Sequence, residues 1–79
     1  MTPARKEPNM ETFTGRFAAR LRELREKAKM SRNELADVIG VKMSAIANWE
    51  NDINMPTLDK LPLIADALKT SVRNLLPKE

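Results

Sequence analysis

The sequence contains few of the side chains that carry out catalysis. Histidine, cysteine and tyrosine are absent, so the usual general bases, nucleophiles and soft metal ligands are missing. Carboxylates remain, but Glu23 with Glu26, and Asp59 with Asp66, are more simply surface or helix-end charges than acid–base pairs. Two glycines in the whole chain cannot form a glycine-rich phosphate loop. We therefore expect no enzyme activity, no cofactor and no metal site.

A different kind of chemistry is suggested between Ser31 and Asn51, where the chain reads SRNELADVIGVKMSAIANWEN. Apolar residues recur there at the spacing of one helix face before Gly40 and another after it: Leu35, Ala36 and Ile39, then Ile46 and Trp49. Gly40 suits the corner between them, since glycine adopts a positive φ without steric cost. The pattern predicts a helix-turn-helix unit, whose second helix can enter the major groove of DNA.

Outward residues of that second helix are candidates for DNA contact. Asn48 could pair with N6 and N7 of adenine, although a polar surface residue is the plainer explanation. Ser44 could bond a base edge or a phosphate, and Lys42 a phosphate or a guanine. Met43 offers apolar contact, for instance with a thymine methyl, and packing against a neighbouring helix or a partner explains it nearly as well.

Three further residues lie at the ends of the two helices. Arg32 opens the first one and could clamp a phosphate or brace Ser44 and Met43, unless it is one more exposed arginine. Asn51 follows the second helix and could bond a phosphate or simply form the turn. Ser31 stands three residues before Glu34, which is the capping-box spacing and predicts a helix start at Arg32.

The remaining elements must hold this unit in place. Residues 1–12 lack periodicity and are expected to form a flexible arm, while residues 13–77 form the domain. A first helix is predicted from near Thr14, with Thr12 as the alternative cap. The second helix of the unit should run from Lys42 or Met43 to Glu50, with Lys42 a poor N-cap.

Two more helices are predicted towards the C-terminus. One begins near Lys60 or Leu61, which places Pro62 in its first turn, where a missing amide costs nothing. A short last helix, 72–76, is capped by Ser71. The resulting fold class is all-α, since no strand-like alternation occurs.

Composition supports a small domain held together by packing alone. The chain has 79 residues, 42% of them apolar, and no cysteine for a disulfide. The net charge of +3 favours a polyanionic partner only weakly. Residues 16–29 carry six basic against two acidic side chains, which suits either a phosphate-facing helix or an ordinary solvated face. With no signal segment and no bilayer-length apolar stretch, we expect a cytoplasmic protein without membrane contact.

These residues resemble a known family. The run from FAARLRELREKAKMSRNELADVIGVKMSAIANWEN to MPTLDKLPLIADALKTSVRNLL is similar to the five-helix DNA-binding domain of the Cro and lambdoid phage repressor family. The resemblance implies that base edges are faced by Arg32, Met43, Ser44 and Asn48, that Lys42 joins them or binds phosphate, and that Ser31 and Asn51 hold the DNA backbone. It also implies an ion pair between Arg25 and Glu50.

The expected function is sequence-specific binding of double-stranded DNA by a transcriptional repressor or regulator. Family members of this type commonly bind as dimers through the last helix, and Leu75 and Leu76 are compatible with such an interface. The alternative is a protein-interaction module, such as an antitoxin that grips its toxin, in which DNA binding is secondary.

Overall fold

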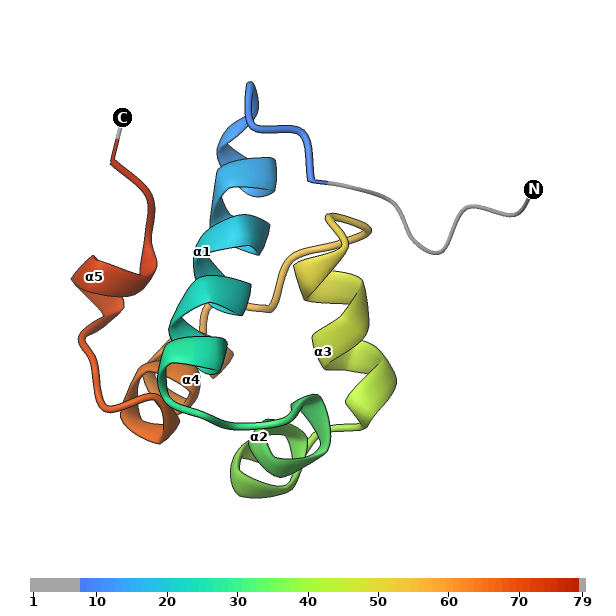
Figure 1. Cartoon of the computed structure of the whole chain (residues 1–79), viewed down its shortest axis with the longest axis vertical. Coiled ribbons are helices and arrows are strands. Elements are labelled where there is room, and N and C mark those ends of the chain that lie inside the picture. The colour runs from blue at the N-terminus through green and yellow to red at the C-terminus, as the bar shows by residue number, and fades with distance from the viewer. Residues whose placement is uncertain (1–7, 79) are drawn as a thin grey trace.

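Residues 8–78, the part of the chain that the computed structural model describes, contain five helices joined by turns and by a longer loop between the third and the fourth helix (Figure 1). No strand occurs within those residues, in agreement with the predicted all-α class. None of the helices there is long and apolar enough to cross a membrane. The helices are α1 (Phe13–Lys27), α2 (Arg32–Ile39), α3 (Met43–Glu50), α4 (Lys60–Ala67) and α5 (Val72–Leu75).

The start of α1 differs from the prediction. Thr12, not Thr14, is the N-cap, and its hydroxyl accepts a hydrogen bond of 3.0 Å from the amide of Gly15. Thr12 is fixed there because its own amide and hydroxyl both donate to the carbonyl of Asn9. Residues 9–12 therefore form a turn on α1, whereas the rest of the predicted arm, residues 1–7, lies outside the described residues.

The ends of α2 follow the sequence signals. The hydroxyl of Ser31 accepts from the amide of Glu34 at 3.0 Å, and the carboxylate of Glu34 accepts from the amide of Ser31 at 2.7 Å, so the predicted capping box is confirmed. At the other end Gly40 has φ of 77°, the left-handed conformation that its place in the corner required. The α2–α3 corner is thereby set by local sequence.

Three other helix ends reach the same left-handed conformation without glycine. Lys29, Asp52 and Lys69 have φ of 61°, 61° and 57°. Each donates its amide to a carbonyl three residues back, and the next residue donates to one five residues back, which is the Schellman arrangement. Side chains are strained in this region, so each of these turns is held against a local cost.

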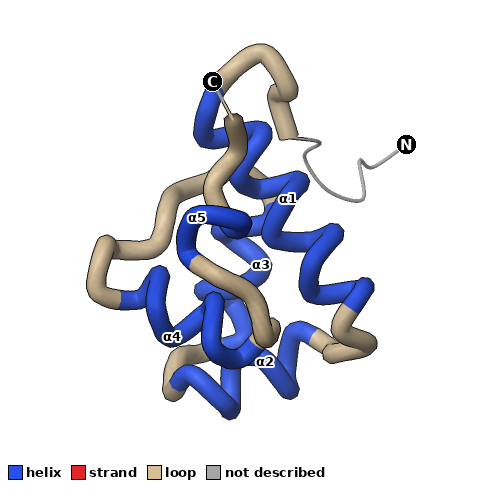
Figure 2. Tube along the Cα trace, turned by 90° about the vertical axis from the view of Figure 1, so that its left-hand side faces the viewer, coloured by secondary structure: helices blue, strands red, loops and turns tan. Residues whose placement is uncertain are grey.

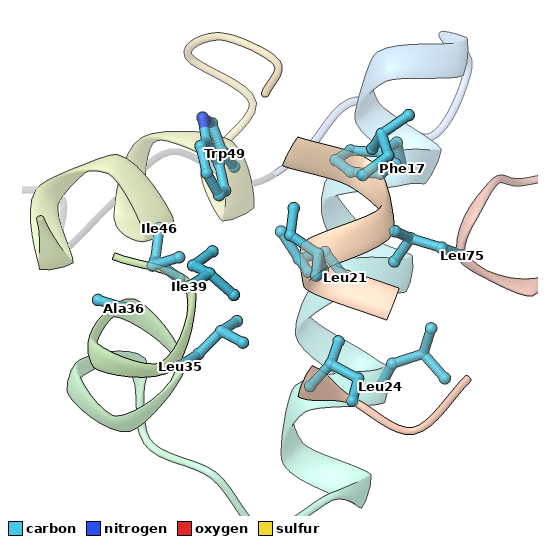
Figure 3. Close-up of a cluster of buried hydrophobic side chains, with 12 residues drawn as sticks. Phe17, Leu21, Leu24, Leu35, Ala36, Ile39, Ile46, Trp49 and Leu75 are labelled. Carbon is cyan, nitrogen blue, oxygen red and sulfur yellow. The ribbon is translucent and has the colours of Figure 1, made fainter. Parts of the chain in front are cut away.

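The core lies between α1 and the other helices (Figure 3). Side chains from α2 and α3 point toward Phe17 and Leu21 of α1, both of which are fully buried. The predicted apolar faces of the helix-turn-helix unit are confirmed, because every one of their members is buried: Leu35, Ala36, Ile39, Ile46 and Trp49. Burial of such aliphatic and aromatic side chains, about 1.5–3 kcal/mol each, is the main stabilising term.

The last two helices pack against each other, with α4 also on α2 and α5 on α1 (Figure 2). Helix α4 begins at Lys60 with Pro62 in its first turn, as predicted. Helix α5 is capped by the Ser71 hydroxyl, as predicted, and ends one residue early, at Leu75. Leu75 is fully buried, so it belongs to the core and is not an exposed residue of a subunit interface. Leu76 is half-buried.

Candidate nucleic-acid interface

Helix α3 has one buried and one exposed face. Ile46, Trp49 and Glu50 turn inward, and α3 packs on both α1 and α2. Figure 1 shows α3 and α5 on opposite sides of α1, so α3 stands at one side of the molecule. The outward face, which we call the α3 surface, carries the candidate residues Lys42, Met43, Ser44, Asn48 and Asn51.

The N-terminal end of the α3 surface is the most open part. Lys42 and Ser44 are exposed, and Met43 keeps 44% of its surface accessible. The side chain of Lys42 makes no capping hydrogen bond, as predicted from its type. The Lys42 side chain therefore accepts no hydrogen bond from the first amides of α3. An anion could approach this end of the helix and contact both those amides and the Lys42 ammonium group.

Further along, Asn48 and Asn51 are half-buried. They lie four and seven residues after Ser44, so the three occupy one stripe of the helix. The amide of Asn51 donates to the carbonyl of Ala47 at 2.9 Å, so Asn51 is the C-cap of α3. No hydrogen bond is formed by the side chain of Asn48 within the described residues, so its amide is free to bind elsewhere.

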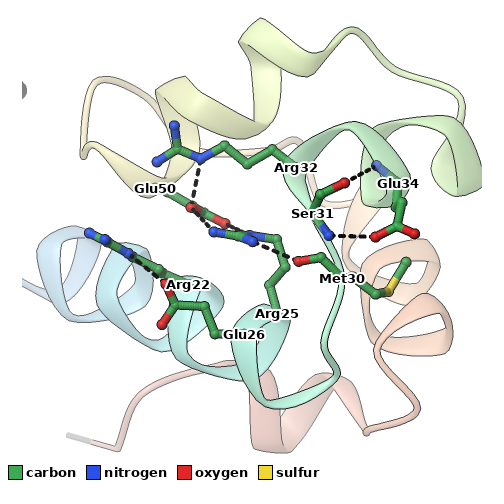
Figure 4. A network of polar contacts seen from close by, with 8 residues as sticks. All are labelled: Arg22, Arg25, Glu26, Met30, Ser31, Arg32, Glu34 and Glu50. Atoms are coloured by element: carbon green, nitrogen blue, oxygen red, sulfur yellow. Dashed lines mark hydrogen bonds and ion pairs between the residues drawn. The ribbon is translucent and has the colours of Figure 1, made fainter.

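Arg32 and Glu50 form a contact that sequence reasoning missed (Figure 4). The predicted pair between Arg25 and Glu50 is present: Nε and Nη2 of Arg25 donate to the two carboxylate oxygens at 2.6 and 3.1 Å. In addition, Nε of Arg32 donates to Oε1 of Glu50 at 3.1 Å. Glu50 therefore links α1, α2 and α3. The family resemblance had supplied one partner for Glu50, and nothing in the sequence spacing indicated a second.

The environment of Arg25 favours its charged form. The hydrogen bond to Glu50 raises the pKa of Arg25, and the attraction of the same carboxylate adds to it, while burial works in the opposite direction. Its Nη1 donates to the carbonyl of Met30 at 2.7 Å. All three guanidinium nitrogens of Arg25 are thus occupied within the protein, and Arg25 is a structural residue.

The basic residues of α1 are less available than their number suggests. Arg20 donates to the backbone carbonyl and side chain of Asn74, at 3.0 and 2.9 Å, and so holds α5. Arg22 pairs with Glu26 at 3.2 Å, and Arg16 donates to the carbonyl of Met10. Four of the six basic side chains of residues 16–29, those of Arg16, Arg20, Arg22 and Arg25, are therefore bonded to other groups of the protein, whereas Lys27 and Lys29 are exposed.

Comparisons with known proteins agree with this architecture. The helix-turn-helix family matches residues 21–75 of the chain. The HTH-type transcriptional regulator AnsR of Bacillus subtilis is 37% identical over 60 residues, which cover 76% of this chain and 52% of that protein. A crystal structure of the P22 c2 repressor with a synthetic operator superimposes with a TM-score of 0.73 and 30% identity, covering 80% of this chain and 96% of that one.

An enzyme also shares part of its sequence with the chain. The (S)-2-hydroxypropylphosphonic acid epoxidase of Streptomyces wedmorensis is 37% identical over 70 residues, which cover 87% of this chain but 35% of the enzyme. The chain spans about half the length of the curated regulators that it matches. The family match covers more than half of the chain and agrees with the five-helix fold, so the chain belongs to the helix-turn-helix family, of the Cro and lambdoid repressor type.

Proposed function

We propose that the chain binds double-stranded DNA in a sequence-specific manner, with α3 in the major groove, and acts as a transcriptional regulator. The observation that carries this proposal is the α3 surface, a row of exposed or half-buried polar and cationic side chains on a helix fixed from behind by buried Glu50. Related regulators and the operator-bound P22 c2 repressor support it. The cytoplasmic location expected from the sequence is part of this proposal.

The predicted contacts divide into two groups. Lys42, Ser31 and Asn51 lie at helix ends and are proposed to bind phosphates, which gives affinity without sequence choice. Ser44 and Asn48 are proposed to bind base edges, with Asn48 on adenine, and Met43 to contact a thymine methyl. Asn48→Ala should then cost about 1–3 kcal/mol against the preferred base and relax the choice at that base pair only.

A selection from random duplexes followed by footprinting tests the proposal. The expected result is one enriched sequence, bound with an affinity that falls steeply from 50 to 200 mM salt. Asn33→Ala is a matched control, since Asn33 is an exposed asparagine of α2 outside the α3 surface. An affinity that is the same at both salt concentrations and for all duplex sequences would contradict the proposal.

Dimer formation is a separate part of the proposal. A two-fold dimer would place two α3 helices about 34 Å apart on a palindromic operator. Because Leu75 is in the core, a C-terminal interface has to use half-buried Leu76 and its exposed neighbours. Leu76→Ala should weaken self-association in sedimentation experiments with little loss of monomer stability, whereas Leu75→Ala should cost about 2–5 kcal/mol of stability at any concentration.

The alternative is a role in protein interaction, and the similarity to part of the epoxidase is the observation that supports it. That match shows a domain of this kind as about one third of an enzyme, so the fold alone does not fix the partner. Under this alternative hypothesis, the chain is a module that binds a protein, such as a toxin. NMR shift changes on adding duplex DNA discriminate the two: a DNA-binding domain should show them on the α3 surface and at Arg32, and a protein-binding module should show none there.

A further inference from the structure

Glu50 holds two arginines that use it in different ways (Figure 4). Its side chain is fully buried, and one carboxylate faces two guanidinium groups, so the cluster keeps one surplus positive charge. All three guanidinium nitrogens of Arg25 donate hydrogen bonds inside the protein, two to Glu50 and one to the carbonyl of Met30. Within the described residues, Arg32 donates a hydrogen bond only from Nε, to Glu50. The surplus charge therefore belongs to Arg32.

The free end of Arg32 is partly exposed. Its side chain keeps 24% of its surface accessible, against 10% for Arg25. Nη2 is covered and has no hydrogen-bond partner within the described residues. Nη1 forms no hydrogen bond there either and is not covered, so it is the nitrogen that an approaching anion can reach. Because Nη2 is covered, Nη1 alone is available to a phosphate in this conformation.

We propose that Glu50 is a positioning residue for DNA binding, acting through Arg32. By accepting a hydrogen bond from Nε, the carboxylate fixes the long side chain so that its accessible nitrogen, Nη1, is directed at the phosphate backbone beside α2 and α3. Ordering an arginine before binding removes the entropy cost of ordering it on DNA. This inference rests on the proposed function, and it assigns to Glu50 a role beyond its pairing with Arg25.

Simple electrostatics predicts the opposite effect of removing the carboxylate. Glu50→Gln deletes a negative charge near the DNA, so charge alone should tighten binding to a polyanion. If Glu50 positions Arg32, the same change should weaken binding, because the guanidinium loses its charged anchor. Asp37→Asn, at an exposed site of α2, removes the same charge without touching Arg32 and is the matched control.

The experiment is fluorescence anisotropy with a labelled 20-base-pair duplex of mixed sequence, titrated at several KCl concentrations and at a temperature where circular dichroism shows each variant folded. Glu50→Gln should bind about three- to tenfold more weakly than the unmodified chain, in keeping with the net contribution of one ordinary hydrogen bond. Its log–log salt slope should fall by about 0.9, the value for one phosphate. Asp37→Asn should bind equally or more tightly. Glu50→Gln binding as tightly as Asp37→Asn would overturn the inference.

A second pair of variants leaves the Arg25–Glu50 pair intact, should Glu50→Gln not fold. Arg32→Ala should lose about tenfold in affinity. Arg32→Lys should recover less than half of that loss on a logarithmic scale, since one ammonium group cannot bond Glu50 and present a second, fixed edge to phosphate. Full recovery by Arg32→Lys would show that only charge matters and would overturn the inference. If the unmodified chain shows no salt-dependent binding, the proposed function itself fails and the inference fails with it.

Discussion

Lys42 occupies a position where stability and DNA binding favour different side chains. As the residue before α3 it has the extended backbone of an N-cap, but its ammonium group cannot accept a hydrogen bond from the helix amides. Serine or threonine would satisfy one of those amides. A lysine at this exposed point instead brings a positive charge to the end of the helix proposed to enter the groove. The proposed DNA contact gives a physical reason for a lysine at this position despite its poor capping.

Lys42→Ser should therefore raise stability and lower DNA affinity at the same time. A side-chain cap adds about 0.5–2 kcal/mol, which corresponds to an increase in Tm of several degrees for a domain of this size. Loss of one phosphate contact should reduce the salt slope by about 0.9. Thermal melts and salt-dependent anisotropy measure the two effects. Lys27→Ser, at another exposed lysine, should change DNA binding less, and a Lys42→Ser variant with unchanged affinity would contradict this role.

At the scale of elements, sequence reasoning worked where a local signal exists and failed where a contact is long-range. The capping box at Ser31 and the corner at Gly40 depend on residues within a few positions, and both were predicted correctly. Thr14 was preferred as the cap over the alternative, Thr12, because the turn that begins at Asn9 and fixes Thr12 lies in the segment predicted to be a flexible arm. Arg32 was predicted to clamp a phosphate or to brace Ser44 and Met43, and its bond to Glu50, which joins residues 18 apart, was not predicted. Such a contact depends on the packing of whole helices.

Gly15→Ala is expected to destabilise α1, although alanine normally favours a helix by about 1 kcal/mol over glycine. A Cβ atom at Gly15 would lie 1.8 Å from the carbonyl oxygen of Asn9, so the turn that supplies the Thr12 cap would have to move. Overpacking of this kind costs about 1–3 kcal/mol. Thermal melts of Gly15→Ala beside Thr12→Ala measure both effects. A higher Tm for Gly15→Ala would mean that the turn moves at no cost.

Lys69→Gly should stabilise the end of α4. Lys69 has a left-handed backbone with φ of 57°, which glycine adopts without the strain of a Cβ atom. The expected gain is about 0.5–1 kcal/mol, offset in part by the greater freedom of glycine in the unfolded chain. Lys27→Gly removes the same charge from a right-handed helical position and should instead lose about 1 kcal/mol. Urea unfolding of the two variants should therefore move in opposite directions.

At the scale of the whole molecule, three helices converge on one buried carboxylate. Small domains hold only a few kcal/mol of net stability, and an ion pair is costly to break from one side once it is buried. The relative placement of α1, α2 and α3 thus depends on Glu50 and its two arginine partners, while apolar packing supplies most of the stability. The α1–α3 pair was predicted from the family resemblance, whereas the third helix joined to it required the folded structure.

Arg25→Ala should destabilise the fold far more than Arg22→Ala. Both are arginines of α1 paired with a glutamate, but the Arg25 side chain is 10% exposed beside a fully buried carboxylate, whereas Arg22 is 30% exposed beside a glutamate that is 57% exposed. Removing Arg25 also leaves the carbonyl of Met30 without its donor at 2.7 Å. The expected loss is about 3–5 kcal/mol for Arg25→Ala, and below about 1 kcal/mol for Arg22→Ala.

Denaturant melts at low and high salt measure the difference, and salt should reduce only the Arg22 effect, since buried pairs are little screened. Equal midpoints for the two variants would mean that Glu50 is held by Arg32 and by packing, without need of Arg25.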